Sequence, residues 1–94
     1  MTSSDAVFIV LPGGVCVTQA FFDKVVKHVN AELPKLKRTL AYPSKVLCGE
    51  FWSVQDKTQH VIIGKCIAYA VVHGMLPLAF AGRTDANAKL YRLK

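Results

Sequence analysis

The segment from Asp56 to Gly74, DKTQHVIIGKCIAYAVVHG, constrains the fold of this chain more than any other stretch. Asp56 at its start and Gln59 three residues later can each satisfy a free amide of a first helical turn. Gly74 is the kind of residue that ends a helix in the left-handed conformation. The segment therefore predicts a helix that begins after Asp56 and runs to His73.

This expected helix has an apolar inner face and an outer face that is only partly polar. Its inner face carries apolar side chains at helical spacing, namely Ile63, Cys66, Ile67, Ala70 and Val71. Its outer face carries Lys57, His60, Val61, Gly64, Lys65, Ala68 and Val72. The C-terminal part of the outer face is too apolar to be fully exposed. We expect the N-terminal strand, the first helix or a second copy of the chain to cover it.

A strand and a helix are expected in the N-terminal third of the chain. The run AVFIVL, residues 6–11, is rich in β-branched and aromatic residues and predicts a buried strand that ends at the turn Pro-Gly-Gly. Thr18 can cap a first helix with an apolar residue at every fourth position up to Leu33, and Pro34 ends that helix. His28 is expected to be a solvated side chain on its polar side.

A connection and a second, shorter helix follow. RTLAY, residues 38–42, predicts a short extended piece. Ser44 is a reasonable cap for a helix within residues 45–54, although Gly49 weakens its first half. Trp52 lies in the apolar stripe of this helix and is expected to anchor the core.

Residues 76–93 predict a β-hairpin, LPLAFAG and KLYRL, joined by RTDANA, which contains the Asp and Asn that turns favour. Leu78, Phe80, Leu90 and Leu93 are expected to close the core. The fold class is therefore α+β: three helices, a C-terminal two-stranded β-hairpin and a short N-terminal strand. A chain of 94 residues is too short for two cores, so residues 1–94 are expected to form a single small domain.

The order of these elements resembles the winged helix-turn-helix, a family of DNA-binding domains. The short helix GEFWSVQ, the turn at Asp56, the longer capped helix and the hairpin ending in KLYRL follow that order over about residues 44–93. The resemblance implies a third helix whose first turn enters the major groove of DNA. The residues of that turn are Lys57, Thr58, Gln59 and His60.

The same resemblance implies contacts with the DNA backbone for other basic residues. Lys65 would reach a phosphate from further along the helix. The hairpin, or wing, would contact the backbone or the minor groove through Arg83, Lys89, Arg92 and Lys94. The same electrostatic surface would be extended by Lys35, Lys37, Arg38 and Lys45. The implied function is that of a small DNA-binding transcriptional regulator.

The positive charge of the chain is concentrated in two segments. Twelve Lys and Arg against six Asp and Glu give a net charge of +6. Residues 34–45 hold four basic residues and sum to +4, whereas residues 83–94 hold four basic residues and one Asp and sum to +3. Clustered positive charge favours polyanions through phosphate contact and counterion release. The charge alone therefore fits nucleic acid or an anionic membrane surface, and ordinary solubility charge is the alternative. Together with the resemblance it makes nucleic acid, DNA more than RNA, the expected partner.

The sequence lacks the usual patterns of a catalytic or metal site. The six acidic residues are scattered, and there is no G-x-S-x-G, no H-E-x-x-H and no phosphate-binding glycine motif. Cys16, Cys48 and Cys66 are 32 and 18 residues apart and form no C-x-x-C pair. We expect three small buried thiols and no disulfide, metal, cofactor or enzymatic activity.

The sequence also predicts a cytoplasmic location and no membrane partner. The N-terminus has no basic segment ahead of its apolar run, which a signal peptide would need. The apolar run VIIGKCIAYAVV contains Lys65 and is shorter than the about 20 residues that span a bilayer. The odd number of cysteines agrees with a reducing compartment.

An alternative function is protein interaction, by a small inhibitor or adaptor carried by a bacterium or its mobile elements. The apolar outer face of the third helix favours this alternative, because the centres of interfaces are poor in charge and rich in aromatic residues. The candidate aromatic contacts are Tyr42, Tyr69 and Tyr91. A homodimer through the same helix is a further expectation, based on Val61, Ala68 and Val72.

Overall fold

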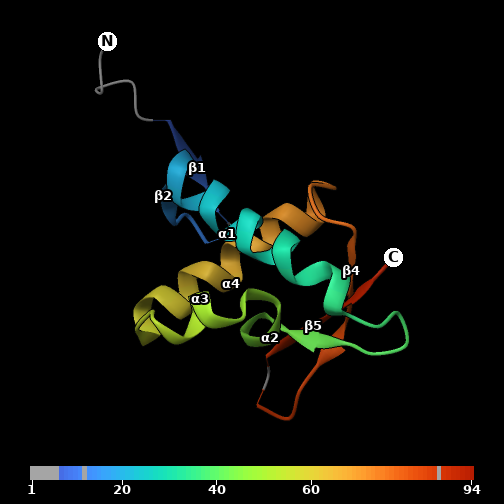
Figure 1. Cartoon of the computed structure of the whole chain (residues 1–94). Helices are drawn as coiled ribbons and strands as arrows, with labels where there is room; N and C mark the ends of the chain where they lie inside the picture. The colour runs from blue at the N-terminus through green and yellow to red at the C-terminus, as the bar shows by residue number, and fades with distance from the viewer. Residues whose placement is uncertain (1–6, 12, 87) are drawn as a thin grey trace.

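The computed structural model describes residues 7–11, 13–86 and 88–94 (Figure 1). Within these ranges the chain forms four α-helices, a short 3-10 helix and two small antiparallel sheets, so the predicted α+β class is confirmed. One sheet, β1–β2, lies beside the start of α1. The other sheet has the strand order β3-β5-β4 and lies at the opposite end of the helices.

The N-terminal run forms half of a hairpin and is not a buried strand. Strand β1 (Phe8–Val10) pairs with β2 (Cys16–Thr18), which the sequence did not predict. Ile9 packs against the core, whereas Phe8 and Val10 are 61% and 63% exposed, and Cys16 opposite Val10 is also exposed. The prediction of a buried strand was wrong because only one face of this two-stranded sheet packs on the core. The other face is exposed to solvent. Ala6 and Pro12 lie outside the described residues.

Helix α1 (Gln19–Glu32) begins where predicted, because the Thr18 hydroxyl accepts a hydrogen bond from the Phe21 amide at 3.1 Å. The chain then continues into the 3-10 helix η2 (Leu33–Lys35), which contains Pro34. His28 is half-buried and its ring stacks on that of Phe51, with the ring centroids 4.4 Å apart. The expectation of a solvated His28 was therefore wrong.

The expected second helix is divided into α2 (Ser44–Cys48) and α3 (Glu50–Ser53). The division occurs at Gly49, whose φ of 58° is a conformation that side-chain-bearing residues avoid. Ser44 is not the cap that was predicted, because strand β3 (Tyr42–Pro43) runs directly into the helix and Ser44 is already its first residue.

Helix α4 (Lys57–Val72) begins where predicted and ends one residue before the predicted end, with His73 as its C-cap. The Asp56 carboxylate accepts a hydrogen bond from the Gln59 amide at 2.9 Å, and Gly74 has a φ of 70°. The predicted inner face is buried, except that Val71 is only half-buried. On the outer face Ala68 is just 9% exposed, whereas Val61 and Val72 are 60% and 80% exposed. The expectation that the C-terminal part of this face is covered is therefore confirmed at Ala68 and wrong at Val72.

The second sheet contains one strand more than the predicted hairpin. Strands β4 (Leu78–Arg83) and β5 (Lys89–Leu93) form that hairpin, and β3 adds to the other side of β5 with Tyr42 opposite Tyr91. Tyr91 is 2% exposed because its side chain packs in the hydrophobic core, so the idea that it is a surface aromatic was wrong. Phe80 is 55% exposed and does not close the core, because it lies on an edge strand next to a bulge.

A continuous hydrophobic core joins all these elements. It runs from Leu11 beside the N-terminal hairpin, through α1 and α4, to Leu78 and Tyr91 in the second sheet. Leu47 and Phe51 connect α2 and α3 to it. Trp52 and Tyr69 pack against its edge and are only partly buried.

Candidate nucleic-acid interface

An open groove of about 870 Å³ lies between the outer face of α4 and the β4–β5 hairpin. The start of α2 and the side chain of Trp52 complete its walls. Four of its lining residues are cationic: Lys45, Lys65, Arg83 and Lys89. None of the described residues that line it is an Asp or a Glu. The described lining of the groove is therefore cationic.

The floor of the groove is apolar and is formed by successive turns of α4. Val61, Gly64 and Ala68 lie three and four residues apart, so they share one side of the helix, and Tyr91 adjoins them from β5. A Cβ added at Gly64 would meet no atom within 4 Å. The absence of a side chain at this position thus leaves space directly above the helix.

Two of the cations face each other at the base of the hairpin turn. Arg83 at the end of β4 is paired in register with Lys89 at the start of β5, and both side chains are exposed. The Arg83 guanidinium lies 5.9 Å from the centre of the Phe80 ring. Burial raises the pKa of the Tyr91 phenol above its usual value, and the positive charge of Arg83 partly opposes that shift. Tyr91 therefore stays neutral at physiological pH.

Lys65 connects the groove with the N-terminal hairpin. Its side chain is half-buried, and a Cβ added at Gly13 would lie 3.2 Å from its ammonium nitrogen. The β1–β2 turn therefore reaches the outer face of α4 at Lys65. This contact does not extend to the C-terminal part of the face, where Val72 is 80% exposed.

Trp52 and His60 form a stacked pair at the edge of the groove. Their ring centroids are 4.0 Å apart with an angle of 9° between the planes. Nε2 of His60 lies 2.8 Å from the carbonyl oxygen of Trp52, a geometry in which the ring nitrogen donates a hydrogen bond. The ring stacking and this hydrogen bond therefore fix the orientation of the His60 imidazole. Trp52 combines the predicted packing role with partial exposure to the groove.

The structure brings together only part of the predicted set of contact residues. The groove is lined by Lys45, His60, Lys65, Arg83 and Lys89. The rest of the first turn of α4 lies just beyond it, with Lys57 and Thr58 exposed and Gln59 half-buried. The apolar floor was not predicted as part of a site. The sequence did contain a signal for it, because positions 61, 64 and 68 hold small or apolar residues at helical spacing. That pattern was interpreted as a helix face that another part of the protein buries.

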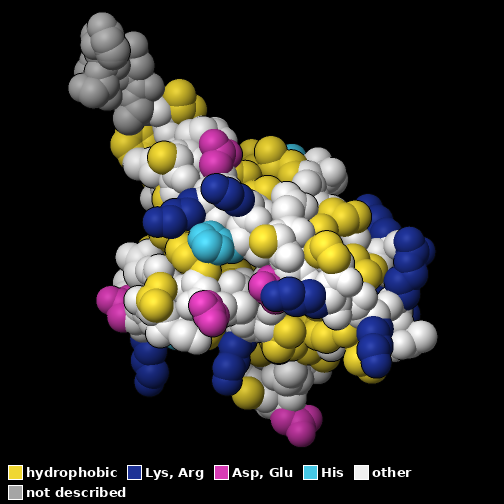
Figure 2. Space-filling view, in the orientation of Figure 1, with side chains coloured by type: hydrophobic (Ala, Val, Ile, Leu, Met, Phe, Trp, Pro, Cys, Tyr) yellow, Lys and Arg dark blue, Asp and Glu magenta, His cyan; other side chains and the backbone are white. Residues whose placement is uncertain are grey.

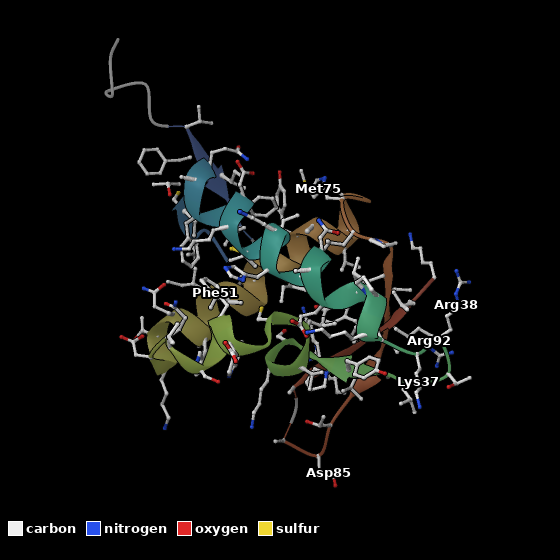
Figure 3. The ribbon with its side chains drawn as sticks, viewed as in Figure 1. Lys37, Arg38, Phe51, Met75, Asp85 and Arg92 are labelled. Atoms are coloured by element: carbon white, nitrogen blue, oxygen red, sulfur yellow. The ribbon has the colours of Figure 1, made fainter. Side chains whose placement is uncertain are left out.

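The remaining basic residues gather at a different place. Arg92 is opposite Ala79 in the sheet, on the other face from Tyr91, and Lys94 follows the end of β5. Figure 3 shows Arg92 at the same end of the molecule as Lys37 and Arg38, and Figure 2 shows Lys and Arg side chains along that edge. The Lys37 amide donates a hydrogen bond to the Tyr42 hydroxyl at 2.9 Å, which ties this loop to β3. These residues form a second basic area.

A smaller hollow of about 430 Å³ lies between α1 and α3. It carries both signs of charge, including His28, Lys35, Glu32 and Glu50. Burial raises the pKa of the Cys48 thiol beside it to about 12, with smaller contributions from Cys66 and Glu32, and burial raises that of Cys66 to about 11. Both thiols are protonated at neutral pH and are therefore poor nucleophiles. In the described part of the chain, no three His, Cys, Asp or Glu side chains are grouped as metal ligands.

No protein-family model matches the chain, and neither a curated protein nor a solved structure matches it. Among the helices that the structure describes, none has the length and apolar character needed to cross a bilayer.

Proposed function

We propose that this protein binds nucleic acid through the groove between α4 and the β4–β5 hairpin, as a small winged-helix-like DNA-binding regulator. The observation that carries the proposal is the set of four cations around the groove, with no acidic side chain among its described lining residues. Such a surface attracts phosphates and gains free energy when condensed counterions are released.

The position of the first turn of α4 supports the same proposal. Lys57 and Thr58 are exposed next to the groove, so they can reach base edges while the hairpin contacts the backbone. Arg83 and Lys89 stand together at the base of the hairpin and supply two adjacent positive charges for phosphates. The order of helix, strand, two short helices, long helix and hairpin agrees with the winged-helix resemblance.

The proposal is tested by titrating the protein into a fluorescent DNA duplex at two salt concentrations. We expect the affinity to fall steeply with salt, with a log-log slope of several units. Lys89→Glu should weaken binding by about tenfold at low salt, whereas Lys27→Glu on α1 makes the same change in charge away from the groove and should have a much smaller effect. Binding that ignores salt, or equal effects of the two variants, would contradict the proposal.

Protein interaction remains a second candidate, because three apolar side chains of the N-terminal hairpin are exposed: Val7, Phe8 and Val10. Val61 and Val72 on α4 are exposed as well and lie on one side of that helix. A homodimer would cover one of these surfaces. Sedimentation of the protein at increasing concentration tests it, and a monomer throughout would remove the homodimer from consideration.

A further inference from the structure

We infer that the groove receives unpaired bases of a single-stranded segment, while the cations around it hold the phosphates. This inference rests on the proposed function and specifies which form of nucleic acid occupies the groove. The observations behind it are the apolar floor, the open space above Gly64, the aromatic pair at the edge and the distribution of the cations.

The rim of the groove can contact the phosphates of any nucleic acid, whereas its apolar floor suits an unpaired base better than a duplex. A duplex presents phosphates and polar base edges to its surroundings, and the flat faces of its bases are hidden in the stack. Val61 and Ala68 would face those polar groups across the groove without any hydrogen bond to offer. An unpaired base presents an apolar face that such a floor can cover.

The groove also has the space that a base requires. Gly64 lies in the middle of the floor with open space where other residues have a Cβ. The volume of about 870 Å³ is within the range of about 300–1,000 Å³ found for small-molecule sites. A flat ring can therefore lie against the helix without displacing a side chain.

Trp52 and His60 give this space an aromatic boundary. Their stacking, with centroids 4.0 Å apart, and the contact from His60 to the Trp52 carbonyl fix both rings before any ligand arrives. Stacking on such rings accepts any base, because each base has a π-face. The site is thus suited to unpaired bases without a strict sequence requirement.

The cations around the floor come from both α4 and the sheet beside it. Lys65 belongs to α4, whereas Arg83 and Lys89 belong to the hairpin, and Lys45 follows β3, where Pro43 pairs with Leu90 next to Lys89. A strand that places a base on Val61 and Gly64 would therefore run along these cations. DNA and RNA share this chemistry, and the experiment below separates them.

A larger side chain at position 64 would fill the groove above α4, and it tests directly whether an unpaired base binds there. Gly64→Leu should preserve the fold, since the added side chain enters open space and leucine favours a helix more than glycine does. Three fluorescent probes of one sequence and about 12 nucleotides would be used: single-stranded DNA, single-stranded RNA and duplex DNA. We expect Gly64→Leu to weaken binding of the preferred single strand by about tenfold and to change duplex binding by less than about twofold.

Two further measurements keep the test independent of that variant. Trp52 is the one tryptophan of the chain, so single strands should quench its fluorescence in the unmodified protein more than the duplex does. Gly64→Ala adds only a methyl group and should weaken single-strand binding less than Gly64→Leu. Thermal unfolding of all three proteins would verify that each is folded.

The outcomes distinguish this inference from the proposed function. Unchanged single-strand binding by Gly64→Leu, or equal losses for single strand and duplex, would overturn the inference and leave nucleic-acid binding in place. No binding of any probe at low salt would overturn both. Binding of an acidic amphipathic peptide in place of all three probes would also overturn both and favour a protein partner.

Discussion

Two glycines of this protein have opposite structural roles. Gly49 joins α2 to α3 with a positive φ, and a Cβ added there would lie 3.0 Å from the carboxylate of Glu32. Gly64 lies within α4 with ordinary helical geometry and open space beside it. The backbone requires glycine at the first position, whereas the second glycine keeps the floor of the groove clear.

This difference predicts opposite effects of one substitution on stability. Gly49→Ala should lower the free energy of unfolding by about 1–3 kcal/mol, because the conformation at this position disfavours every residue with a side chain. Gly64→Ala is the matched control and should raise that free energy by up to about 1 kcal/mol, since alanine is the better helix former. Urea unfolding of both variants measures the two values. A similar loss of stability in both would contradict this view of the glycines.

At the level of single elements, the β4–β5 hairpin combines cations at its base with an acid at its tip. Arg83 and Lys89 flank the turn, and Asp85 projects from its end, away from the body of the molecule (Figure 3). A carboxylate at this position would repel a phosphate backbone that lies along the hairpin. If the hairpin binds nucleic acid as proposed, Asp85 would limit the affinity that it provides.

Replacing Asp85 with lysine should raise the affinity for nucleic acid severalfold at low salt. The salt dependence should become steeper by about one unit of log-log slope if the new lysine contacts one phosphate. Asp23→Lys on α1 makes the same change in net charge far from the hairpin and should alter the affinity less. Fluorescence anisotropy at several salt concentrations gives both quantities. Indistinguishable slopes for the two variants would show that the hairpin does not contact the ligand.

Elements whose ends depend on neighbouring residues could be predicted from the sequence. Thr18, Asp56 and Gly74 define the ends of α1 and α4 through local hydrogen bonds and backbone preferences. Strand β3 is two residues long and exists because its partner β5 lies far along the chain, which no local pattern reveals. Strand β2 was missed for a different reason: it pairs with its neighbour β1 across a turn at Gly13 and Gly14, and that local hairpin signal was interpreted only as the end of a strand.

As with the fold, only part of the candidate site could be predicted from the sequence. The cations at its rim were identified from their charge and from the expected hairpin. Strand alternation already places Arg92 on the other face from Lys89, whereas the approach of the hairpin to α4, which decides which cations line the groove, does not follow from the sequence. Alternation along a strand shows which residues share a face, but not that Tyr91 is covered while Phe80 is exposed.

At the level of the whole molecule, the continuous core connects the N-terminal hairpin to the C-terminal sheet. Leu11 lies at one end of this core and is almost fully buried, whereas Tyr91 belongs to the other end. Because one core joins both ends, the stability of the elements at one end depends on the packing at the other. The chain should therefore unfold in one cooperative step.

Leu11→Ala tests this dependence, and it should lower the free energy of unfolding by about 2–5 kcal/mol through the cavity it creates. The loss of helical circular dichroism and the change in Trp52 fluorescence should share one midpoint in urea. Val10→Ala on the exposed side of the same hairpin is the control and should cost less than about 0.5 kcal/mol. Two separate midpoints would show that the two ends unfold independently.

The exposed face of the N-terminal hairpin has a consequence for the colloidal behaviour of the protein. Residues 6–18 carry no charge, and Phe8 and Val10 are exposed on β1. The net charge of +6 opposes contact between copies in dilute buffer. A bound polyanion removes that repulsion and leaves the apolar strands free to meet. We therefore expect turbidity to be greatest near the mixing ratio at which the charges of protein and polyanion balance, and to clear when either is in excess.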